Sequence, residues 1–402
     1  MTDRLKKYSV SIIAVLLIVI LIALPTGYED AVIYQGTDKV KAKVLSTDES
    51  AVRSSGLIQS GEQYCEVELL EGKFKGDETR AVNMLSGSLE SDKIFEEGDV
   101  AHVVVSYNDD GITSVTMNDH YRIDKELILA GIFILFLILF AGGTGLRAVC
   151  SFAITILTIW KILVPAYLGG ANPIWCGILI TAFLTLLIIF FVYGFDMKTL
   201  AACGGAFLGV LVTCILGCIF TDAFKIHGAV MSYSESLLYA GYQDLSLTRI
   251  FMSAIFIGAS GAMIDLSVDI TSAVNEVVHK KPDIGWKEAM FSGMNVGRAA
   301  MGTMTTTLLL AYSGGYIALL MTFMAQGTPI ENILNYKYVS AEILQTIVGS
   351  LGLVTVAPLT ALTSGILLTG KRYKAVIMRK NAEKQAEDAA SASDAPALTE
   401  GN

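Results

Sequence analysis

The sequence predicts an all-α polytopic membrane bundle of about eight helices with an inserted extracytoplasmic β-rich domain, either a small barrel or a sandwich. Three observations predict this fold class. Hydrophobic residues make up 53% of the 402 residues and charged residues only 17%, whereas about a quarter of the residues in a soluble protein are charged. Long uncharged apolar runs recur along the chain. One segment between the first two runs instead alternates polar and apolar residues.

The apolar runs define the predicted spans, because a helix needs roughly 20 apolar residues to cross the hydrocarbon core. The longest run contains the sequence LGGANP at residues 168–173, which we interpret as a turn between two spans. The predicted spans are then Tyr8–Leu24, Leu127–Leu146, Ala148–Leu168, Pro173–Phe195, Thr199–Thr221, Ile250–Ile264, Ala299–Ile330 and Ile343–Gly370.

The first span follows three basic residues, Arg4, Lys6 and Lys7. It is either an uncleaved anchor or a signal peptide. Its uncharged core is longer than a usual signal-peptide core, and the residues after Leu24 lack an A-x-A cleavage site. We therefore favour a signal-anchor helix at residues 1–27.

The distribution of basic residues predicts the orientation. With the N-terminus in the cytoplasm, the inner loops carry most of the Lys and Arg residues, as the positive-inside rule requires. They hold Arg147, Lys198, Lys280, Lys281, Lys287, Arg298, Lys371, Arg372 and Lys374, against Lys225, Arg249 and Lys337 on the other side. Residues 28–124 are then extracytoplasmic, residues 125–370 form a seven-helix membrane domain, and residues 371–402 are a cytoplasmic basic stretch with a disordered tail.

Residues 28–124 contain four alternating stretches, which predict half-buried strands at 40–44, 64–69, 100–105 and 112–116. The sequence NDDG at 108–111 is a hairpin signal between the last two. Short meandering strands favour a small barrel or sandwich of the OB or SH3 type. This segment is either a folded cap over the outer face or a module that binds a partner or ligand.

Several function classes have little support. The net charge of −9 lies mostly in the soluble segment and the tail, which gives no indication of nucleic-acid binding. None of the six cysteines forms a C-x-x-C pair, and H-E-x-x-H and P-loop motifs are absent from the sequence. We expect no metal, no cofactor and no enzymatic activity.

Small and polar residues mark the later spans. Ala201, Gly205, Gly209, Thr213 and Gly217 recur every four residues, which predicts close helix packing. In the seventh span, a threonine run that includes Thr303, Thr306 and Thr307 is a candidate pathway lining, and Gly314–Gly315 should weaken the helix.

Proline and a capping signal mark the end of the membrane domain. Thr328-Pro-Ile-Glu331 predicts a capped short helix. In the eighth span, Pro358 removes a backbone hydrogen bond, so we expect a kink and count it with the pathway lining.

The sixth span carries carboxylates. Asp265 and Asp269 share one helix face, which continues to Glu276. Asp265 lies about 16 residues after Arg249, roughly 24 Å along the helix, and so close to the cytoplasmic boundary. Arg298 starts the seventh span on the same side. The pair forms either a structural Asp–Arg clamp or an ion or proton site. For Asp269 and Glu276 a solvated face is the simpler interpretation.

These motifs together resemble the YibE/YibF family of bacterial membrane proteins. The resemblance covers roughly residues 127–370. It is carried by Gly258–Asp265, Ile270–Glu276, Ser292–Arg298, Met301–Met304, Leu310–Tyr312, Glu342–Val354 and Pro358–Thr360, and Glu235 and Asp244–Leu245 fit the preceding part. It implies a multi-pass, permease-like protein whose substrate class the family does not specify. The family pattern commonly has an acidic residue, an Asn and an Arg where this chain has Ala299, Thr306 and Gln345, which implies altered or lost activity if those groups line a site.

The leading hypothesis is a secondary transporter or permease of the bacterial plasma membrane, with Asp265 as the ion- or proton-responsive group. The alternative is a non-transporting scaffold or sensor that acts through residues 28–124. The expected partners are the lipid bilayer, an ion or small molecule, and a paired membrane protein or a second copy.

Overall fold

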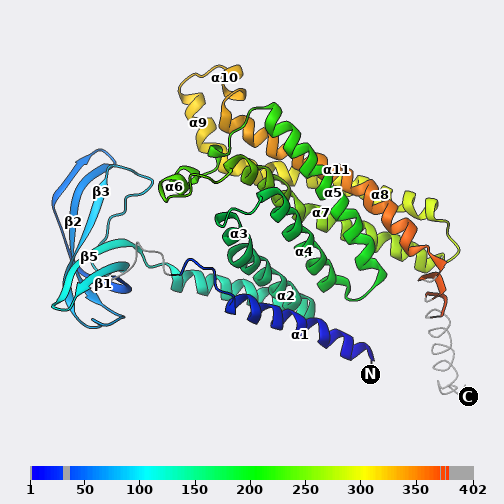
Figure 1. Cartoon of the computed structure of the whole chain (residues 1–402), viewed down its shortest axis with the longest axis horizontal. Helices are drawn as coiled ribbons and strands as arrows, with labels where there is room; N and C mark the ends of the chain where they lie inside the picture. The colour runs from blue at the N-terminus through cyan, green and yellow to red at the C-terminus, as the bar shows by residue number, and fades with distance from the viewer. Residues whose placement is uncertain (1, 30–36, 372, 376, 380–402) are drawn as a thin grey trace, which may run out of the picture. The chain divides into compact units, whose positions relative to one another are not determined.

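The computed structural model describes residues 2–29, 37–371, 373–375 and 377–379 (Figure 1). The tail prediction from residue 380 onward lies outside these ranges. The chain divides into two compact units, Pro25–Gly145 and the remainder, and each is described by itself.

The first unit is built on a closed five-stranded barrel. Its strands are β1 (Thr37–Ser55), β2 (Ile58–Leu69), β3 (Glu78–Ser86), β4 (Val100–Asn108) and β5 (Gly111–His120). They pair in the order β1-β2-β3-β5-β4, with β4 returning to β1. All pairs are antiparallel except β3 with β5. This is the arrangement of an OB-type barrel, so the expectation of a small barrel is confirmed.

The sequence pattern accounts for four of the five strands. Inward residues such as Val40, Val44, Val103 and Val105 are buried, while their neighbours in sequence face outward. Asn108 pairs with Gly111 across a two-residue turn, as predicted. β3 was not predicted.

A loop between β3 and β4 closes one end of the barrel. Phe95 inserts its fully buried ring, which lies 4.5 Å from the ring of His120. Buried Gln63 donates to the Phe95 carbonyl at 2.8 Å and accepts from the Phe95 N–H at 3.1 Å. Its strand neighbour Asn83 donates to Gln63 and to the carbonyl of Lys93. These bonds fix the plug from the inside of the barrel.

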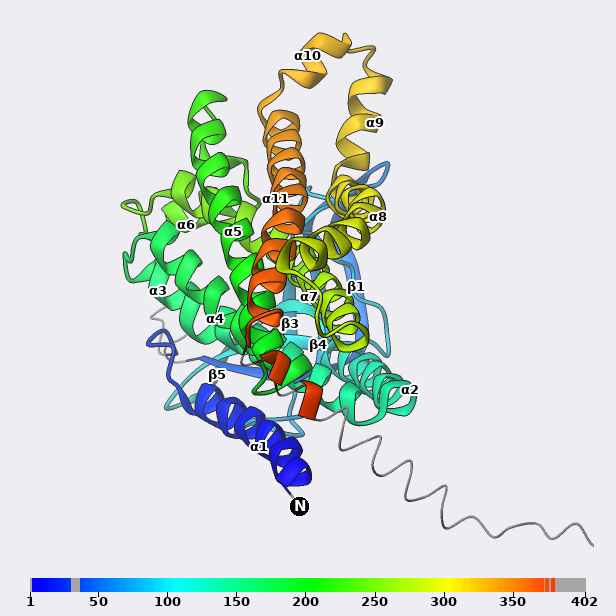
Figure 2. The ribbon, with the colours of Figure 1, turned by 90° about the vertical axis from the view of Figure 1, so that its right-hand side faces the viewer.

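The rest of the described chain is mainly helical (Figures 1 and 2). The helices are α1 (Thr2–Ala23), α2 (Ile123–Thr158), α3 (Val164–Leu168), α4 (Pro173–Tyr193), α5 (Met197–Ala223), α6 (Ser234–Tyr239), α7 (Leu247–Lys280), α8 (Trp286–Ser313), α9 (Ile317–Ala325), α10 (Ile330–Leu334) and α11 (Lys337–Leu368). Among the described residues, six helical stretches are long and apolar enough to cross a membrane. Within α1 the apolar stretch Val10–Ala23 is shorter.

The second and third predicted spans form one helical stretch of 46 residues, Ile123–Leu168. Gly142 interrupts α2 with φ 54° and ψ −130°, close to the predicted boundary. Further along, Ile159–Leu163 is a π-helical turn. Pro165 follows it, and because proline has no N–H the regular helical ladder cannot continue there.

Small residues bring α5 and α11 into close contact, as the stripe predicted. A Cβ on Gly205 would overlap Thr360, and one on Gly209 would overlap Val356. Gly352 of α11 meets Thr213 in the same way. Figure 2 shows α11 between α5 and α8.

Two buried hydroxyl pairs join α7 to α11. Ser267 lies 3.0 Å from Thr360, and Thr271 lies 2.9 Å from Ser364. From the first pair to the second, the residue numbers increase along both helices, so α7 and α11 run parallel. The Gly205–Thr360 and Gly209–Val356 contacts show that α5 runs opposite to α11.

Two local predictions have different outcomes. Gly314 ends α8 and begins a short 3₁₀ turn, so the predicted weak point is confirmed. The predicted capping box is wrong: α10 begins after Pro329, and no side chain caps it. Thr328 is one residue too early, because Pro329 itself occupies the cap position.

Candidate functional site

The carboxylates of α7 lie on a face that the rest of the described chain leaves exposed. Asp265, Asp269, Ser272 and Glu276 are all exposed, whereas Leu266, Ser267 and Ile270 on the opposite side are buried. The predicted shared face is therefore present. It lies beside α4, whose last residue contacts it.

Two tyrosines relate α7 to α4. The Tyr167 hydroxyl lies 2.8 Å from the Ser253 Oγ and donates to the Pro173 carbonyl, where α4 begins. The Tyr193 hydroxyl, where α4 ends, donates to the Val268 carbonyl and lies 2.6 Å from the Ser272 Oγ. The two helices thus run parallel between these contacts. α4 has 21 residues and spans roughly 30 Å, about the thickness of the hydrocarbon core.

These two contacts locate Asp265 along the length of α4. It lies seven residues, or roughly 10 Å, before Ser272, and twelve residues, or roughly 18 Å, beyond Ser253. Asp269 lies roughly 4 to 5 Å before Ser272. Asp265 therefore lies level with a point about a third of the way along α4, measured from the Tyr193 end.

Arg298 does not pair with these carboxylates. A Cβ on Gly297 would lie 3.0 Å from Ile270, so Arg298 starts from the level of Asp269. Its guanidinium nevertheless contacts Asn295, at 3.5 Å, and within the described residues no ion pair links it to Asp265 or Asp269. The Asp–Arg clamp is thus not formed in this structure. Glu276 instead pairs with Lys280 at 3.2 Å, on an exposed surface.

The candidate pathway-lining residues also lie on exposed surfaces. Thr303, Thr306 and Thr307 of α8 donate to carbonyls of their own helix, those of Ala300, Gly302 and Thr303. Pro358 is exposed, and α11 continues as one helix through it. Their role as pathway lining stays a prediction.

A second polar cluster was missed by the sequence reasoning. We call it the Glu342 cluster: Tyr312, Tyr316, Glu342, Gln345 and Thr346. The span predicted from its uncharged residues starts at Ile343, immediately after the charge, whereas α11 begins at Lys337 and includes Glu342. Defining a span by its uncharged residues therefore leaves out a carboxylate that belongs to the same helix.

The Glu342 cluster contacts the same α7 face as the carboxylates. A Cβ on Gly258 would lie 2.8 Å from the Tyr312 hydroxyl and 3.9 Å from the Gln345 Nε2. Gly258 is two turns before Asp265 and shares its helix face. One face of α7 thus carries polar groups at both ends.

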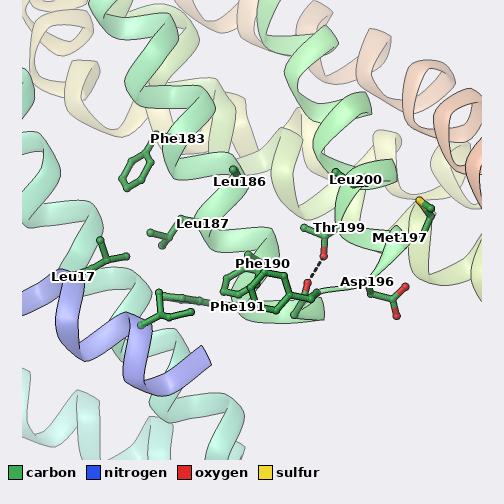
Figure 3. Close-up of a pocket in the computed structure, with 13 residues that line it drawn as sticks. Leu17, Phe183, Leu186, Leu187, Phe190, Phe191, Asp196, Met197, Thr199 and Leu200 are labelled. Atoms are coloured by element: carbon green, nitrogen blue, oxygen red, sulfur yellow. Dashed lines mark hydrogen bonds between the residues drawn. The ribbon is translucent and has the colours of Figure 1, made fainter. Parts of the chain in front are cut away.

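An apolar groove lies elsewhere, between α1, α4 and the start of α5 (Figure 3). Its volume is about 590 Å³, and Leu17, Phe183, Leu187 and Phe190 line it. The Thr199 hydroxyl donates a hydrogen bond to the Gly194 carbonyl at 2.7 Å. Figure 3 shows the Asp196 carboxylate pointing away from the phenylalanines. The groove fits hydrocarbon better than a charged solute.

Comparison with known families matches most of the helical region that follows the barrel. The model of the YibE/F-like protein family covers residues 129–370, more than half of the chain. The chain belongs to the YibE/F-like family. The matched region starts within α2 and ends just after α11, so it includes both polar ends of the α7 face. The barrel lies outside it.

The other comparisons add no relative: no curated protein and no solved structure matches the chain. The family and the six apolar helices together identify a membrane protein. In the described ranges, no group of three or more His, Cys, Asp or Glu side chains is placed to hold a metal ion.

Proposed function

We propose that this YibE/F-like protein is a secondary transporter or permease whose ion- or proton-responsive group is Asp265. One observation carries the proposal: Asp265 is exposed on α7 at a depth that the apolar helix α4 shares. A carboxylate costs about 2.5 to 3.5 kcal/mol near the centre of a membrane helix. Such groups usually face water, a partner or an ion pathway, because lipid offers them no compensation.

The directions of the helices support a topology of successive spans. α4, α7 and α11 run in one direction, and α5 and α8 in the other. This alternation is what consecutive membrane crossings require. With α1 as one crossing and the two halves of α2–α3 as two more, the number is eight. The positive-inside rule then places both termini in the cytoplasm and the barrel outside the plasma membrane.

A scaffold or sensor is the second candidate. It is favoured by the barrel, a separate compact unit with its own buried core and a plugged end. In this alternative the barrel binds an envelope partner, and the helices only anchor it. The two proposals predict opposite effects of changes in α7 and in the barrel.

The test is flux in proteoliposomes loaded with a pH-sensitive dye and challenged with a panel of ions and metabolites. We expect Asp265→Asn to abolish a flux that the wild-type protein supports. Asp283→Asn, an exposed loop carboxylate, is the control and should retain it. Unchanged flux in Asp265→Asn would count against transport through α7. Loss of cellular function on deletion of the barrel alone would then favour the scaffold.

A further inference from the structure

The Glu342 cluster contains polar atoms without partners. The Glu342 Oε1 and the Tyr312 hydroxyl are both shielded from solvent, and neither has a hydrogen-bond partner in the described part of the chain. Tyr316 and Thr346 lie beside the Glu342 carboxyl, and Gln345 lies beside Tyr312. Buried polar atoms normally find partners, so two such atoms in one cluster mark it as a place that could accommodate a polar or charged ligand.

Among the described residues, no ion pair gives the Glu342 carboxylate a counter-charge. In both hydroxyl pairs between α7 and α11 the two residues are 93 positions apart in the sequence. The same spacing puts Arg249 of α7 at the level of Glu342 of α11. No ion pair joins the two, however, within the residues that the structure describes. Lys337, at the start of α11, lies over the ring of Tyr338. A shielded carboxylate without a paired charge is costly, and either a bound cation or a proton compensates it.

The chemistry of the cluster selects the kind of cation. Glu342 offers a carboxylate, Tyr312 and Tyr316 offer phenol oxygens, Thr346 a hydroxyl and Gln345 an amide. These are hard oxygen ligands, and the cluster has no thiol or imidazole to favour a transition metal. One carboxylate neutralises one positive charge. The set therefore suits an alkali cation better than a divalent ion.

We propose that the Glu342 cluster is a binding site for a monovalent metal cation. The site lies at the Ser253 end of the α7 face, with Gly258 between it and Asp265. The Glu342 carboxylate of α11 and the Asp265 carboxylate of α7 then lie along the same side of α7, with Asp265 roughly 10 Å beyond Gly258. The proposal that a cation binds here depends only on the residues of the cluster. The proposal that the cation then passes to Asp265 rests on the proposed transport function.

The first test is the thermal stability of the full-length protein in detergent. Sodium, potassium and lithium chloride are compared with choline chloride at equal ionic strength, since a ligand stabilises the state that binds it. We expect one alkali cation to raise the Tm of wild type and of Asp265→Asn alike. The rise should be lost in Glu342→Gln and reduced in Tyr312→Phe. Glu331→Gln, an exposed carboxylate of α10, is the matched control and should keep it.

A second measurement covers the case in which Glu342→Gln does not fold. Infrared difference spectra of the wild-type protein, recorded on exchanging choline for the alkali cation, should show carboxylate bands together with tyrosine bands. Tyr312→Phe should change the tyrosine bands. Equal Tm values in all four salts, or a cation response that persists in Glu342→Gln, would overturn the site. Loss of flux in Asp265→Asn with cation binding intact would leave the site standing and separate it from transport.

Discussion

The hydroxyls of Ser267 and Thr360 lie 3.0 Å apart at the buried contact between α7 and α11. Thr271 and Ser364 repeat the contact one turn further on. On its other side Thr360 presses against Gly205 of α5, where a Cβ would lie 2.5 Å from the Thr360 Cα. One threonine thus joins three helices, by a hydrogen bond to α7 and by close packing against α5.

The first prediction concerns this hydrogen bond. Ser267→Ala and Thr360→Val should each destabilise the bundle, and a double-mutant cycle should give a coupling of about 0.5 to 1.5 kcal/mol. The measurement is reversible unfolding in mixed detergent–SDS micelles. Thr303→Val is the control, because its hydroxyl bonds within α8, so it should show no coupling to Ser267. Purely additive effects of Ser267→Ala and Thr360→Val would mean that the hydroxyls do not interact.

The second prediction concerns packing between α5 and α11. Gly205→Ala forces a methyl group against the backbone of Thr360, so it should destabilise the bundle by about 1 to 3 kcal/mol in the same assay. The neighbouring Gly204→Ala is the matched control, since its Cβ would lie 3.5 Å from Thr363, an ordinary contact. It should be neutral or slightly stabilising, because Ala favours helix more than Gly does. Equal effects of the two changes would contradict the close contact.

A third prediction concerns the barrel plug. Phe95→Ala removes a fully buried ring and should cost about 3 to 5 kcal/mol of barrel stability. Gln63→Leu should also destabilise the barrel, because it leaves the backbone groups of Phe95 and the amide of Asn83 without their partner. In hydrogen exchange of the full-length protein, the backbone amides of β2 and β3 should lose protection. Unaltered exchange in both variants would mean that the loop does not close the barrel.

Much of this architecture could be predicted from the sequence. Alternation identified β1, β2, β4 and β5 because their inward positions are apolar. β3 broke the pattern, since its central inward residue is Asn83, which serves the plug. The stripe of small residues on α5 predicted a close contact but not that α11 is the partner, because a stripe carries no information about what covers it.

The site was less predictable than the fold. Helical periodicity correctly put Asp265 and Asp269 on one face. It could not decide whether Arg298 points at them, because residues at the same depth can face different sides of two packed helices. Of the two interpretations of Asp265 and Arg298, the Asp–Arg clamp has no ion pair among the described residues, and the ion or proton site stays a prediction. Glu342 was part of the family resemblance but was not chosen as a site residue, because the span was drawn from its uncharged residues, although helices continue past the apolar core.

The final prediction is a pH dependence in the barrel. Hydrogen bonds from Ser86, and then from the N–H groups of Ser88 and Gly87, lower the pKa of Asp92 to about 2 from the usual 3.8. The folded state therefore favours the ionised carboxylate. Its contribution is fully present above about pH 4 and is lost as the pH falls through about 2.

The check compares protection factors for β3 and the following loop between pH 5 and pH 2, corrected for intrinsic exchange. Wild type should lose protection in this window. Asp92→Asn should be less protected at pH 5 and should show a shallower pH dependence, because the titrating group is gone. Asp109→Asn, in the β4–β5 turn, should follow wild type, since no described hydrogen bond reaches its carboxylate. A steep loss that persists in Asp92→Asn would assign the acid sensitivity to another carboxylate.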